Sequence, residues 1–419
     1  MTQRRVVITG IGMVTPLGID EDVVWRRMLA GETGIGPITS FDQEAFISPY
    51  KVKLAAEVDS EIVAEALATM RRRPVDRALD FAMVAGDQAL RQAGLIEAEP
   101  PFEPREVPVI IGTGTGSAQS LSQAFGRFAA KGPKGLLPSS VPRVMFNAIS
   151  ANLSMHFKLT GPNYMVISAC TSAANALGDA YRRVRSGEFD IAVSGGAEGC
   201  LDPFFFGIWN NLGVLSPEPD PAMACRPFDA ERQGTALGEG AALLVLESLE
   251  SAQARGARVR GEIVGYGESS DAGHITGPNV EGQARAIEKA LQSAAGVVEP
   301  ADVAYINAHG TATRTNDTTE SAAIRAALGD VADEIPVGSN KSFFGHTLGA
   351  CGALETAVTL MALEKGLIPP NFNLVTPDPD CPVRLAGREP EAMEGSVALK
   401  NSFGFGGGNA VLVLAGADR

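Results

Sequence analysis

The chain has 419 residues, of which 45% are hydrophobic and 20% charged, a composition typical of globular proteins with a large core. This length exceeds one typical domain, so two halves or two domains are expected. The net charge of -14 argues against nucleic acid as the main partner. No apolar stretch approaches the roughly 18 residues that a membrane span needs, so no membrane insertion is expected.

The cysteines and the first nine residues give information about the cellular compartment of the protein. Five cysteines, an odd number without paired spacing, are typical of reduced thiols. Residues 1–9 lack the apolar core of a secretory signal. Together these features predict a cytoplasmic protein.

Apolar segments with strand character alternate with helical segments along the chain, which favours a layered α/β fold. In chain order, the first half is expected to contain a strand at 5–10, a helix at 21–30, a strand at 107–112, a helix at 171–185 and strands at 191–195 and 241–247. The second half is expected to contain a helix at 282–295, a strand at 303–308, helices at 318–328 and 350–364, and a strand at 410–415. Asp20 is a plausible N-cap of the first helix, and Gly31 lies just beyond its end.

A faint internal repeat relates the two halves. A glycine-rich turn runs into an apolar strand at 238–246 and again at 406–414. A reactive residue leads a small-residue helix in each half, Cys170 in one and His346 in the other. This pattern predicts a duplicated α/β unit, divided into residues 1–255 and 256–419, with the active site where the halves meet.

Cys170 stands where an apolar run with β character meets a helix rich in Ala and Ser. At a helix N-terminus the dipole lowers the pKa of a thiol, and the free N–H groups can stabilise an oxyanion. A buried cysteine can instead be a small apolar filler. The other four cysteines are interpreted in that second way.

His309 closes an apolar strand in Asn-Ala-His-Gly-Thr, and His346 precedes an Ala/Gly-rich helix in Phe-Gly-His-Thr. One thiol and two imidazoles at strand ends or helix starts predict acyl transfer through a thioester. Metal ligation is the alternative, and the sequence disfavours it because neither histidine has a second ligand at zinc-site spacing.

Asp317 and Glu320 follow His309, and two interpretations stay open. They could be caps that complement the dipole at a helix start. Alternatively, one of them pairs with Lys341 inside the site.

Glycine clusters at 10–12 and 112–116 lack the helix context of a dinucleotide-binding turn. The cluster at 404–409 holds Phe405 amid glycines. That pattern suits a mobile gate or a backbone oxyanion donor.

Together these motifs resemble the β-ketoacyl-acyl carrier protein synthases, condensing enzymes of the thiolase superfamily, and most of all their type II elongating branch. The resemblance runs from residue 5 to the end and is carried by 169–172, 307–311, 341–346 and 401–407. A Cys-His-His set separates this branch from thiolases, which use a second cysteine, and from initiating synthases, which pair Cys with His and Asn.

The resemblance implies a five-layered αβαβα thiolase-like fold, a homodimer, and neither a cofactor nor a metal. Cys170 would accept an acyl chain from acyl carrier protein. His309 and His346 would then promote decarboxylation of malonyl carrier protein, and the resulting enolate would attack the Cys170 thioester. The product would be a β-ketoacyl carrier protein that is two carbons longer.

Further roles are implied by the same resemblance. The backbone N–H groups of Cys170 and Phe405 would form the oxyanion hole, and Phe405 with Gly406 and Gly407 would form a gate. A second gating loop matches Asp271 to Thr276. Lys341 would hold His346 in order through a network with Glu320, with Asp317 nearby.

Several positions depart from the family pattern. Gly408 stands where Thr is usual, so the gate is expected to be looser. Thr115, Trp209, Ser139 and Ser140 occupy expected acyl-pocket positions, and the two serines replace a Phe pair near the expected dimer interface. These changes favour a polar or rigid acyl chain, such as a polyene or polyketide intermediate, beside ordinary fatty acid synthesis.

Arg71, Arg72 and Arg73 are the expected docking patch for the acidic carrier protein, with a solvated helix face as the alternative. Two other functions are weighed. A non-catalytic chain-length partner of a heterodimer would lack the nucleophile that Cys170 supplies. A thiolase-like enzyme acting on coenzyme A thioesters would lack the second histidine.

Overall fold

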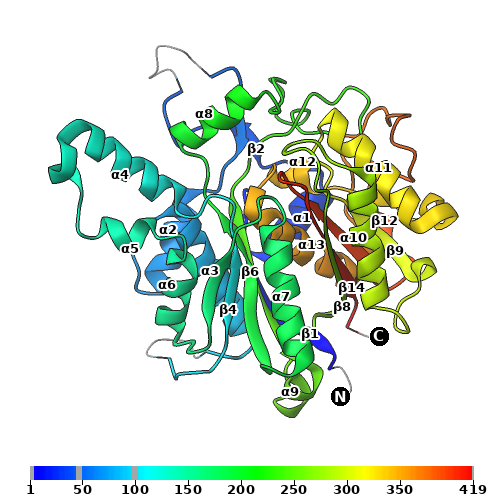
Figure 1. Cartoon of the computed structure of the whole chain (residues 1–419), viewed down its shortest axis with the longest axis horizontal. Coiled ribbons are helices and arrows are strands. Elements are labelled where there is room, and N and C mark those ends of the chain that lie inside the picture. Colours follow the sequence, from blue (N-terminus) through cyan, green and yellow to red (C-terminus); the bar gives the residue numbers. More distant parts are fainter. Residues whose placement is uncertain (1–3, 44–49, 97–101, 418–419) are drawn as a thin grey trace.

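The computed structural model describes residues 4–43, 50–96 and 102–417. Its centre is a ten-stranded sheet in the order β10-β9-β13-β14-β8-β1-β7-β6-β4-β5 (Figure 1). The strands are β1 (Val6–Val14), β4 (Val109–Gly112), β5 (Asn163–Val166), β6 (Ile191–Glu198), β7 (Gly240–Ser248), β8 (Gly261–Ser270), β9 (Val303–Asn307), β10 (Val337–Gly338), β13 (Val397–Phe403) and β14 (Gly408–Ala415). Five of these strands come from each half of the chain.

The two halves of the sheet share one pairing pattern. Strands β1 and β8 are paired at the centre of the sheet. On the first-half side, β7 pairs antiparallel with β1, and β6 pairs antiparallel with β7. On the second-half side, β14 pairs antiparallel with β8, and β13 pairs antiparallel with β14. The outer strands then add in parallel. The glycine-rich repeat leads into β7 and β14, which hold equivalent places. Two similar halves are therefore confirmed, while their division at residue 255 stays a prediction.

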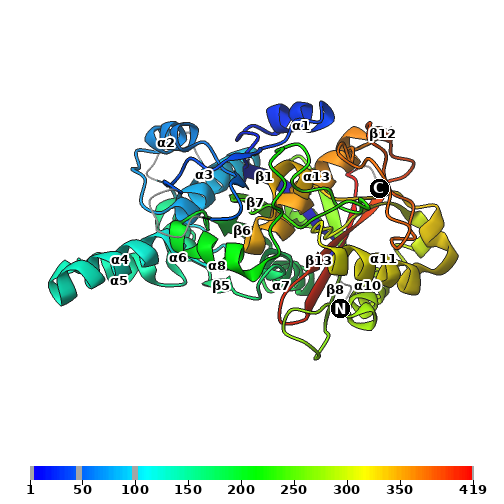
Figure 2. The same ribbon diagram turned by 90° about the horizontal axis from the view of Figure 1, so that it is seen from above.

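Helices cover both faces of each half-sheet, which gives five layers. Helices α7 (Ser172–Ser186) and α13 (Cys351–Lys365) pack against each other and against both half-sheets. Helices α3 (Arg77–Gln92) and α6 (Ala148–Phe157) cover the outer face of the first half. Helices α10 (Val280–Ser293) and α11 (Arg314–Leu328) cover that of the second (Figures 1 and 2).

Glycines in the two central strands let an outer helix approach the sheet closely. A Cβ atom added at Gly12 of β1 would lie 2.0 Å from the Ala85 carbonyl oxygen of α3. A Cβ added at Gly267 of β8 would lie 2.2 Å from the Ala290 nitrogen of α10. The glycines at 10–12 therefore serve helix-on-sheet packing, and the second half repeats the arrangement.

The predicted elements agree with the observed ones, mostly within about three residues at each end. Helix α1 (Glu21–Leu29) is capped by Asp20, whose side chain accepts from the Val23 N–H. The exceptions are β1, which continues to Val14, and α11, which begins at Arg314 and is capped by Thr313. Neither Asp317 nor Glu320 is the N-cap, but Asp317 lies in the first turn, where a carboxylate can complement the helix dipole, and Glu320 lies further along the helix.

The sequence patterns did not anticipate several elements. Of those introduced above, they are α3, α6, β5, β8, β10 and β13. The others are α2 (Ser60–Thr69), α4 (Ala118–Lys131), α5 (Ser140–Val144), α8 (Pro203–Leu212), α9 (Leu249–Ala254), α12 (Lys341–Phe344) and the pairs β2 (Ile35–Pro37)–β3 (Leu54–Ala56) and β11 (Leu367–Ile368)–β12 (Glu391–Ala392). Helices α4 and α5 form an arm, residues 118–147, which projects from the body (Figures 1 and 2). In the described part of the chain, no helix combines the length and apolarity needed to cross a membrane.

Candidate active site

Cys170 lies in the sharp turn that joins β5 to α7. The preceding Ala169 has a φ angle of +54°, a left-handed conformation that is uncommon for a residue with a Cβ atom. Helix α7 begins at Ser172, with Thr171 as its N-cap. The turn therefore holds the thiol beside the positive end of a buried helix.

Both histidines are positioned through their backbones. His309 follows β9, and the Glu320 carboxylate accepts hydrogen bonds of 2.8 Å from the N–H groups of His309 and Gly310. His346 follows α12, donates its N–H to the Ala236 carbonyl at 2.7 Å and accepts from the Gly238 N–H at 3.0 Å. The backbone of a histidine from the second half is thus hydrogen-bonded to residues that lie just before β7 in the first half.

The thiol and the two imidazoles meet between the halves. The His346 Nε2 lies 3.1 Å from the Cys170 Sγ. The rings of His309 and His346 are perpendicular, with centroids 5.3 Å apart. All three side chains are buried. The structure therefore gathers the three residues that the sequence singled out into one group.

The same three side chains could in principle hold a metal ion, because one ligand atom of each lies within 4.8 Å of the other two. Sequence spacing did not reveal this geometry, since the ligands come from three separate elements. The Lys341 ammonium lies 3.4 Å from the His309 Nδ1. A fixed positive charge beside the group disfavours a second cation, so the site fits thiol–imidazole chemistry better.

A buried charge network supports the histidines from behind. The Glu355 carboxylate binds the Lys341 Nζ at 2.6 Å and the Lys400 Nζ at 2.8 Å. Burial disfavours the Lys341 ammonium, but Glu355 outweighs that effect and raises the pKa of Lys341 above its usual range. Lys341 also donates to the His309 carbonyl oxygen. The network therefore places a permanent positive charge at His309.

The predicted partners of Lys341 were wrong. Lys341 contacts His309 rather than His346, and its carboxylate partner is Glu355 rather than Glu320. Glu320 is occupied by the two backbone N–H groups near His309 and by the Asn401 amide at 3.2 Å. Glu355 and Lys400 were missed, although a charged residue inside a strongly apolar helix or strand is a signal that the sequence does contain.

Asp317 belongs to a separate buried cluster. Its carboxylate accepts from the Phe228 N–H at 2.9 Å and lies 3.4 Å from the Arg232 guanidinium, which also binds Asp378. Burial raises the pKa of Asp317 to about 6. These contacts hold α11 to the segment that carries Arg232, and none of them is with Lys341.

The protonation state of the thiol differs from the prediction. Burial raises the pKa of Cys170 to about 11, and the Lys341 charge and the Phe405 N–H offset only part of that rise. The sequence reveals the helix start but not the exclusion of water, and that exclusion acts against the lowered thiol pKa expected at a helix N-terminus. Burial and then the Lys341 charge lower the pKa of His309 and of His346 well below the usual range. At neutral pH the site holds a thiol and two neutral imidazoles.

The two predicted gating segments contact each other. In the turn between β13 and β14, Gly406 and Gly407 have φ angles of +85° and +76°. The Gly406 N–H donates to the Ile275 carbonyl at 2.7 Å, and the Asp271 N–H donates to the Gly407 carbonyl at 2.8 Å. The Phe405 N–H is directed at the Cys170 sulfur. A movement of either segment therefore affects the other and the nucleophile.

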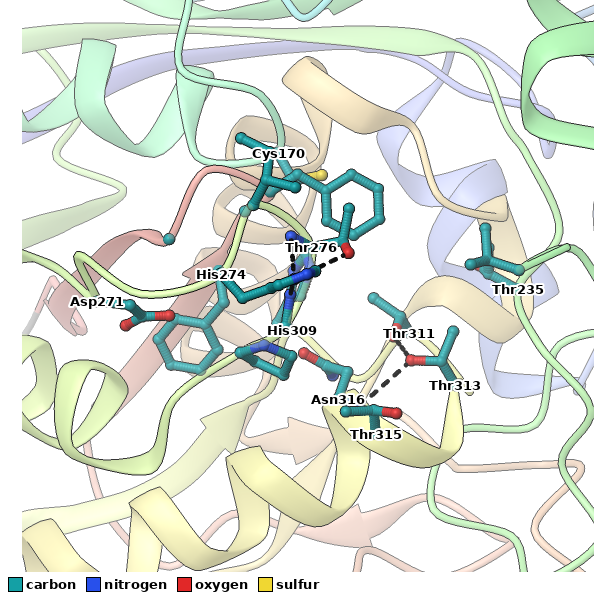
Figure 3. A pocket seen from close by; sticks show the side chains of 18 of the residues that line it. Cys170, Thr235, Asp271, His274, Thr276, His309, Thr311, Thr313, Thr315 and Asn316 are labelled. Atoms are coloured by element: carbon teal, nitrogen blue, oxygen red, sulfur yellow. Dashed lines mark hydrogen bonds between the residues drawn. The ribbon is translucent and has the colours of Figure 1, made fainter. Parts of the chain in front are cut away.

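A cavity of about 410 Å³ leads to this group. Trp209 and Phe405 line one part of it, with parallel rings whose centroids are 5.8 Å apart. Threonines line another part, on the side away from Asp271 (Figure 3). They are Thr311, Thr313 and Thr315, and Thr276 of the gating loop also lines the cavity. The cavity thus has an apolar aromatic part and a hydroxyl-rich part.

Three expected acyl-pocket residues do not line this cavity of the single chain. The Thr115 hydroxyl and N–H both bind the buried Glu198 carboxylate, which turns that side chain away. Ser139 and Ser140 lie at the start of α5 on the projecting arm. These three residues therefore lie outside the cavity of one chain, and their place in an acyl pocket stays a prediction, while Trp209 does line the cavity.

The arginine run lies beyond the end of α2. Arg71 has a φ angle of +58°, and Arg71 and Arg73 are exposed. Arg72 is partly buried, with its guanidinium 3.3 Å from the Asn152 side-chain oxygen. The helix-face interpretation was therefore wrong, and only two of the three charges face solvent.

Sequence models of two domains match most of the chain. The model of the β-ketoacyl synthase N-terminal domain matches residues 3–252, and that of the β-ketoacyl synthase C-terminal domain matches residues 260–375. The chain belongs to the β-ketoacyl synthase family. The predicted family and thiolase-like fold are thereby confirmed, and the chain is an acyltransferase.

Named relatives agree with this assignment. A 3-oxoacyl-acyl-carrier-protein synthase 2 of Synechocystis is 39% identical over 99% of this chain and 98% of its own length. The enzyme of the same name from Staphylococcus aureus strain COL is 38% identical over 98% of both chains. Both are similar to this β-ketoacyl synthase along its whole length.

Solved ketosynthase structures superpose closely. The ishigamide ketosynthase/chain length factor has a TM-score of 0.90 at 36% identity and covers 99% of both chains. A type II polyketide ketosynthase, solved with its acyl-carrier protein and bound to the hexaketide, has a TM-score of 0.88 at 30% identity, covering 99% of this chain and 100% of its own. The fold of this β-ketoacyl synthase is thus found in structures of elongating ketosynthases.

Proposed function

We propose that this β-ketoacyl synthase elongates an acyl chain held on Cys170 by decarboxylative condensation with malonyl-acyl carrier protein. The observation that carries the proposal is the contact of the Cys170 thiol with His346, with His309 beside it and Lys341 behind. In this proposal the catalytic residues are Cys170, His309 and His346, and Lys341 and Glu320 position them. The steps require neither an organic cofactor nor a metal.

In the first step, Cys170 takes the acyl chain from its carrier. The resting thiol is neutral, so attack on the incoming thioester carbonyl is coupled to proton transfer from Sγ to the His346 Nε2, 3.1 Å away. A new C–S bond forms to Cys170 and the bond to the carrier thiolate breaks. The His346 imidazolium returns the proton to that departing thiolate.

In the second step, malonyl carrier protein replaces the first carrier. Lys341 donates toward the His309 Nδ1, which leaves the proton of the neutral ring on Nε2. That N–H and the His346 ring can stabilise the oxygen of the malonyl thioester as its carboxyl group leaves as CO₂. The electron pair of the broken C–C bond becomes an enolate.

The enolate carbon then attacks the acyl carbonyl on Cys170. The oxyanion of the tetrahedral intermediate would be stabilised by the N–H groups of Cys170 and Phe405, because the Phe405 N–H already points at the sulfur. Collapse breaks the C–S bond, releases a β-ketoacyl chain on the carrier and leaves a Cys170 thiolate, which takes up a proton from water to restore the resting thiol. In this proposal the turn at Gly406 and Gly407 carries Phe405 aside when the chain enters.

The hydroxyl-rich part of the cavity suits the pantetheine arm of a carrier protein. Thr311, Thr313 and Thr276 line it, and their hydroxyl groups can donate to or accept from the two amides of such an arm. The Thr311 and Thr313 hydroxyls lie 2.9 Å apart. The arm would enter along this side, past Thr311 and Thr313, and reach Cys170.

Carrier docking is proposed at the arginine run. Arg71 and Arg73 are exposed beyond α2, and an acidic carrier helix would be attracted to them. Exchanging both for glutamate should raise KM for carrier protein several-fold at low salt, with kcat and Cys170 alkylation unchanged. The matched control is R105E, another exposed arginine. An unchanged KM in the double variant contradicts docking at this run.

A homodimer is proposed from unpaired surface. β5 is an edge of the ten-stranded sheet, and Ile167 just after it is 51% exposed. The α4–α5 arm carries further exposed apolar side chains, which are Leu121, Phe125, Phe128, Leu136, Leu137, Val141, Met145 and Phe146. Monomers rarely expose such a patch, so a second copy of the chain is the proposed cover. Ser139 and Ser140 would then lie near the interface.

Two alternatives have direct tests. A chain-length partner would require a paralogue, so affinity capture with two differently tagged copies asks whether the chain pairs with itself. A coenzyme A enzyme would accept acyl-coenzyme A in place of acyl carrier protein. A cytoplasmic location also stays a prediction.

The deciding experiment incubates the protein with malonyl carrier protein and a panel of acyl carrier proteins, followed by mass spectrometry of intact carriers. The proposal expects β-ketoacyl carriers and an acyl adduct on Cys170. An absence of both with every saturated and unsaturated chain offered, from a correctly folded protein, contradicts it. The panel also separates fatty acid chains from polyene or polyketide chains.

A further inference from the structure

The aromatic contact in the cavity has a definite geometry. Trp209 of α8 and Phe405 of the gate turn both line the cavity that holds Cys170. Their rings are almost parallel, with an interplanar angle of 13° and centroids 5.8 Å apart. Such an offset stack contributes stabilisation beyond the burial of area alone. The indole of Trp209 therefore stabilises the present position of the Phe405 ring.

The two rings differ in how firmly they are held. Helix α8 is fixed at its start by Asp202, which accepts from the Phe204 N–H at 3.0 Å. Next to Trp209, the Asn210 side-chain oxygen accepts from the N–H groups of Lys51 and Val52 at 2.9 and 3.1 Å. Phe405 stands in a turn of four residues, three of them glycines. When the gate opens, Phe405 moves and the indole stays.

In the proposed function, an acyl chain on Cys170 takes the space that the Phe405 ring now fills in the cavity. The Phe405 N–H is directed at the Cys170 sulfur, so this residue is an immediate neighbour of the thioester that would form. Its departure would leave one flat face of the indole as the cavity wall. Leu212 and Val214 continue that wall as apolar side chains. The chain would therefore run past the indole.

Opening the gate loses the stacking energy between Trp209 and Phe405. Whether an equivalent contact replaces it depends on the chemical nature of the acyl chain. A conjugated chain is planar and has π electrons, so it can take the place of the phenyl ring against the indole. A saturated chain gains apolar contact but not the stack. We propose, on the basis of the proposed function, that Trp209 is a specificity-determining residue that selects flat, conjugated acyl chains.

The test compares two chains of equal length on the same carrier, an octatrienoyl and an octanoyl thioester. The selectivity is the ratio of their kcat/KM values for condensation with malonyl carrier protein. W209L should lower this ratio about 2- to 12-fold, the range that corresponds to one aromatic stack. W209F, which keeps a smaller ring, should fall in between. L212A, one turn along α8 in the same wall, should change both kcat/KM values alike.

A second measurement places the chain without relying on turnover. The chain has two tryptophans, Trp25 in α1 and Trp209. In W25F all tryptophan emission comes from Trp209, and in W209F all of it comes from Trp25. Loading Cys170 with the trienoyl chain should quench W25F strongly and W209F weakly, and loading with octanoyl should quench neither.

The outcomes separate this inference from the function on which it rests. Adducts on Cys170 with an unchanged selectivity ratio in W209L, or equal quenching in W25F and W209F, overturn the role of Trp209 and leave the condensing function intact. No adduct on Cys170 with either chain overturns the proposed function and this inference with it. A lowered ratio together with selective quenching supports both.

Discussion

The two halves of the molecule each place a reactive side chain ahead of a buried central helix, but they surround it differently. Before α7, Cys170 sits in a strained turn after Ala169, among alanine, serine and threonine. Before α13, His346 sits near Lys341, Lys400 and the Glu355 carboxylate they share. The first half thus supplies a neutral nucleophile, and the second supplies imidazoles under a fixed positive charge.

This difference shows how a duplicated fold divides one reaction. Burial makes the thiol a poor thiolate by itself, so the first half depends on His346 to take its proton. Burial, and then the Lys341 charge, lower the pKa of both imidazoles, so that each neutral ring can accept or donate a proton. Neither half holds a complete site, and the chemistry exists only where they meet.

The largest expected effect comes from removing each imidazole in turn. H346A should slow acylation of Cys170 by about 100- to 10,000-fold, because the thiol loses its proton acceptor. H309A should leave acylation within a few-fold and slow malonyl decarboxylation by about 100- to 1,000-fold, through loss of a donor to the developing enolate. Single-turnover acylation and CO₂ release measure the two steps. Equal losses of both steps in both variants would contradict the division of roles.

Next comes the buried ion pair. K341A leaves part of the Glu355 charge without its partner, so the free energy of unfolding should fall by about 3 to 5 kcal/mol. The control is K365A at the end of α13, whose pair with Asp22 is exposed and should contribute less than about 1 kcal/mol. Urea unfolding measures both. A K341A loss no larger than that of K365A is the contradicting result.

A smaller effect is expected in the pH dependence of the thiol. Since burial raises the pKa of Cys170 to about 11, the thiolate fraction rises as the pH approaches that value. The rate of Cys170 alkylation by iodoacetamide should therefore grow about tenfold per pH unit between neutral and mildly alkaline pH. A rate that is already constant at neutral pH would show a thiolate and restore the original expectation.

Much of the fold was predictable from the sequence because its signals are local. Apolar runs between glycines marked β7 and β14, and their likeness revealed the duplication. Cys170, His309 and His346 stood out because each lies where a strand ends or a helix starts. The structure added what local patterns do not contain, namely that these three ends converge.

The errors share a physical cause, which is that burial is not visible in a motif. The helix start at Cys170 suggested a thiolate, whereas the exclusion of water decides the pKa. Glu355 lies within an apolar helix and Lys400 within an apolar strand. Only the fold shows that the Glu355 carboxylate pairs with both Lys341 and Lys400. Ser139 and Ser140 lie on the projecting arm, for which a second chain is the proposed partner.

The most direct test of the central claim is mass spectrometry of C170A with malonyl and acyl carrier proteins. If Cys170 only carries the chain while His309 and His346 break the malonyl C–C bond, this variant converts malonyl carrier to acetyl carrier and yields no β-ketoacyl product. A β-ketoacyl carrier made by C170A, or decarboxylation that is lost in C170A but kept in H309A, would contradict the account.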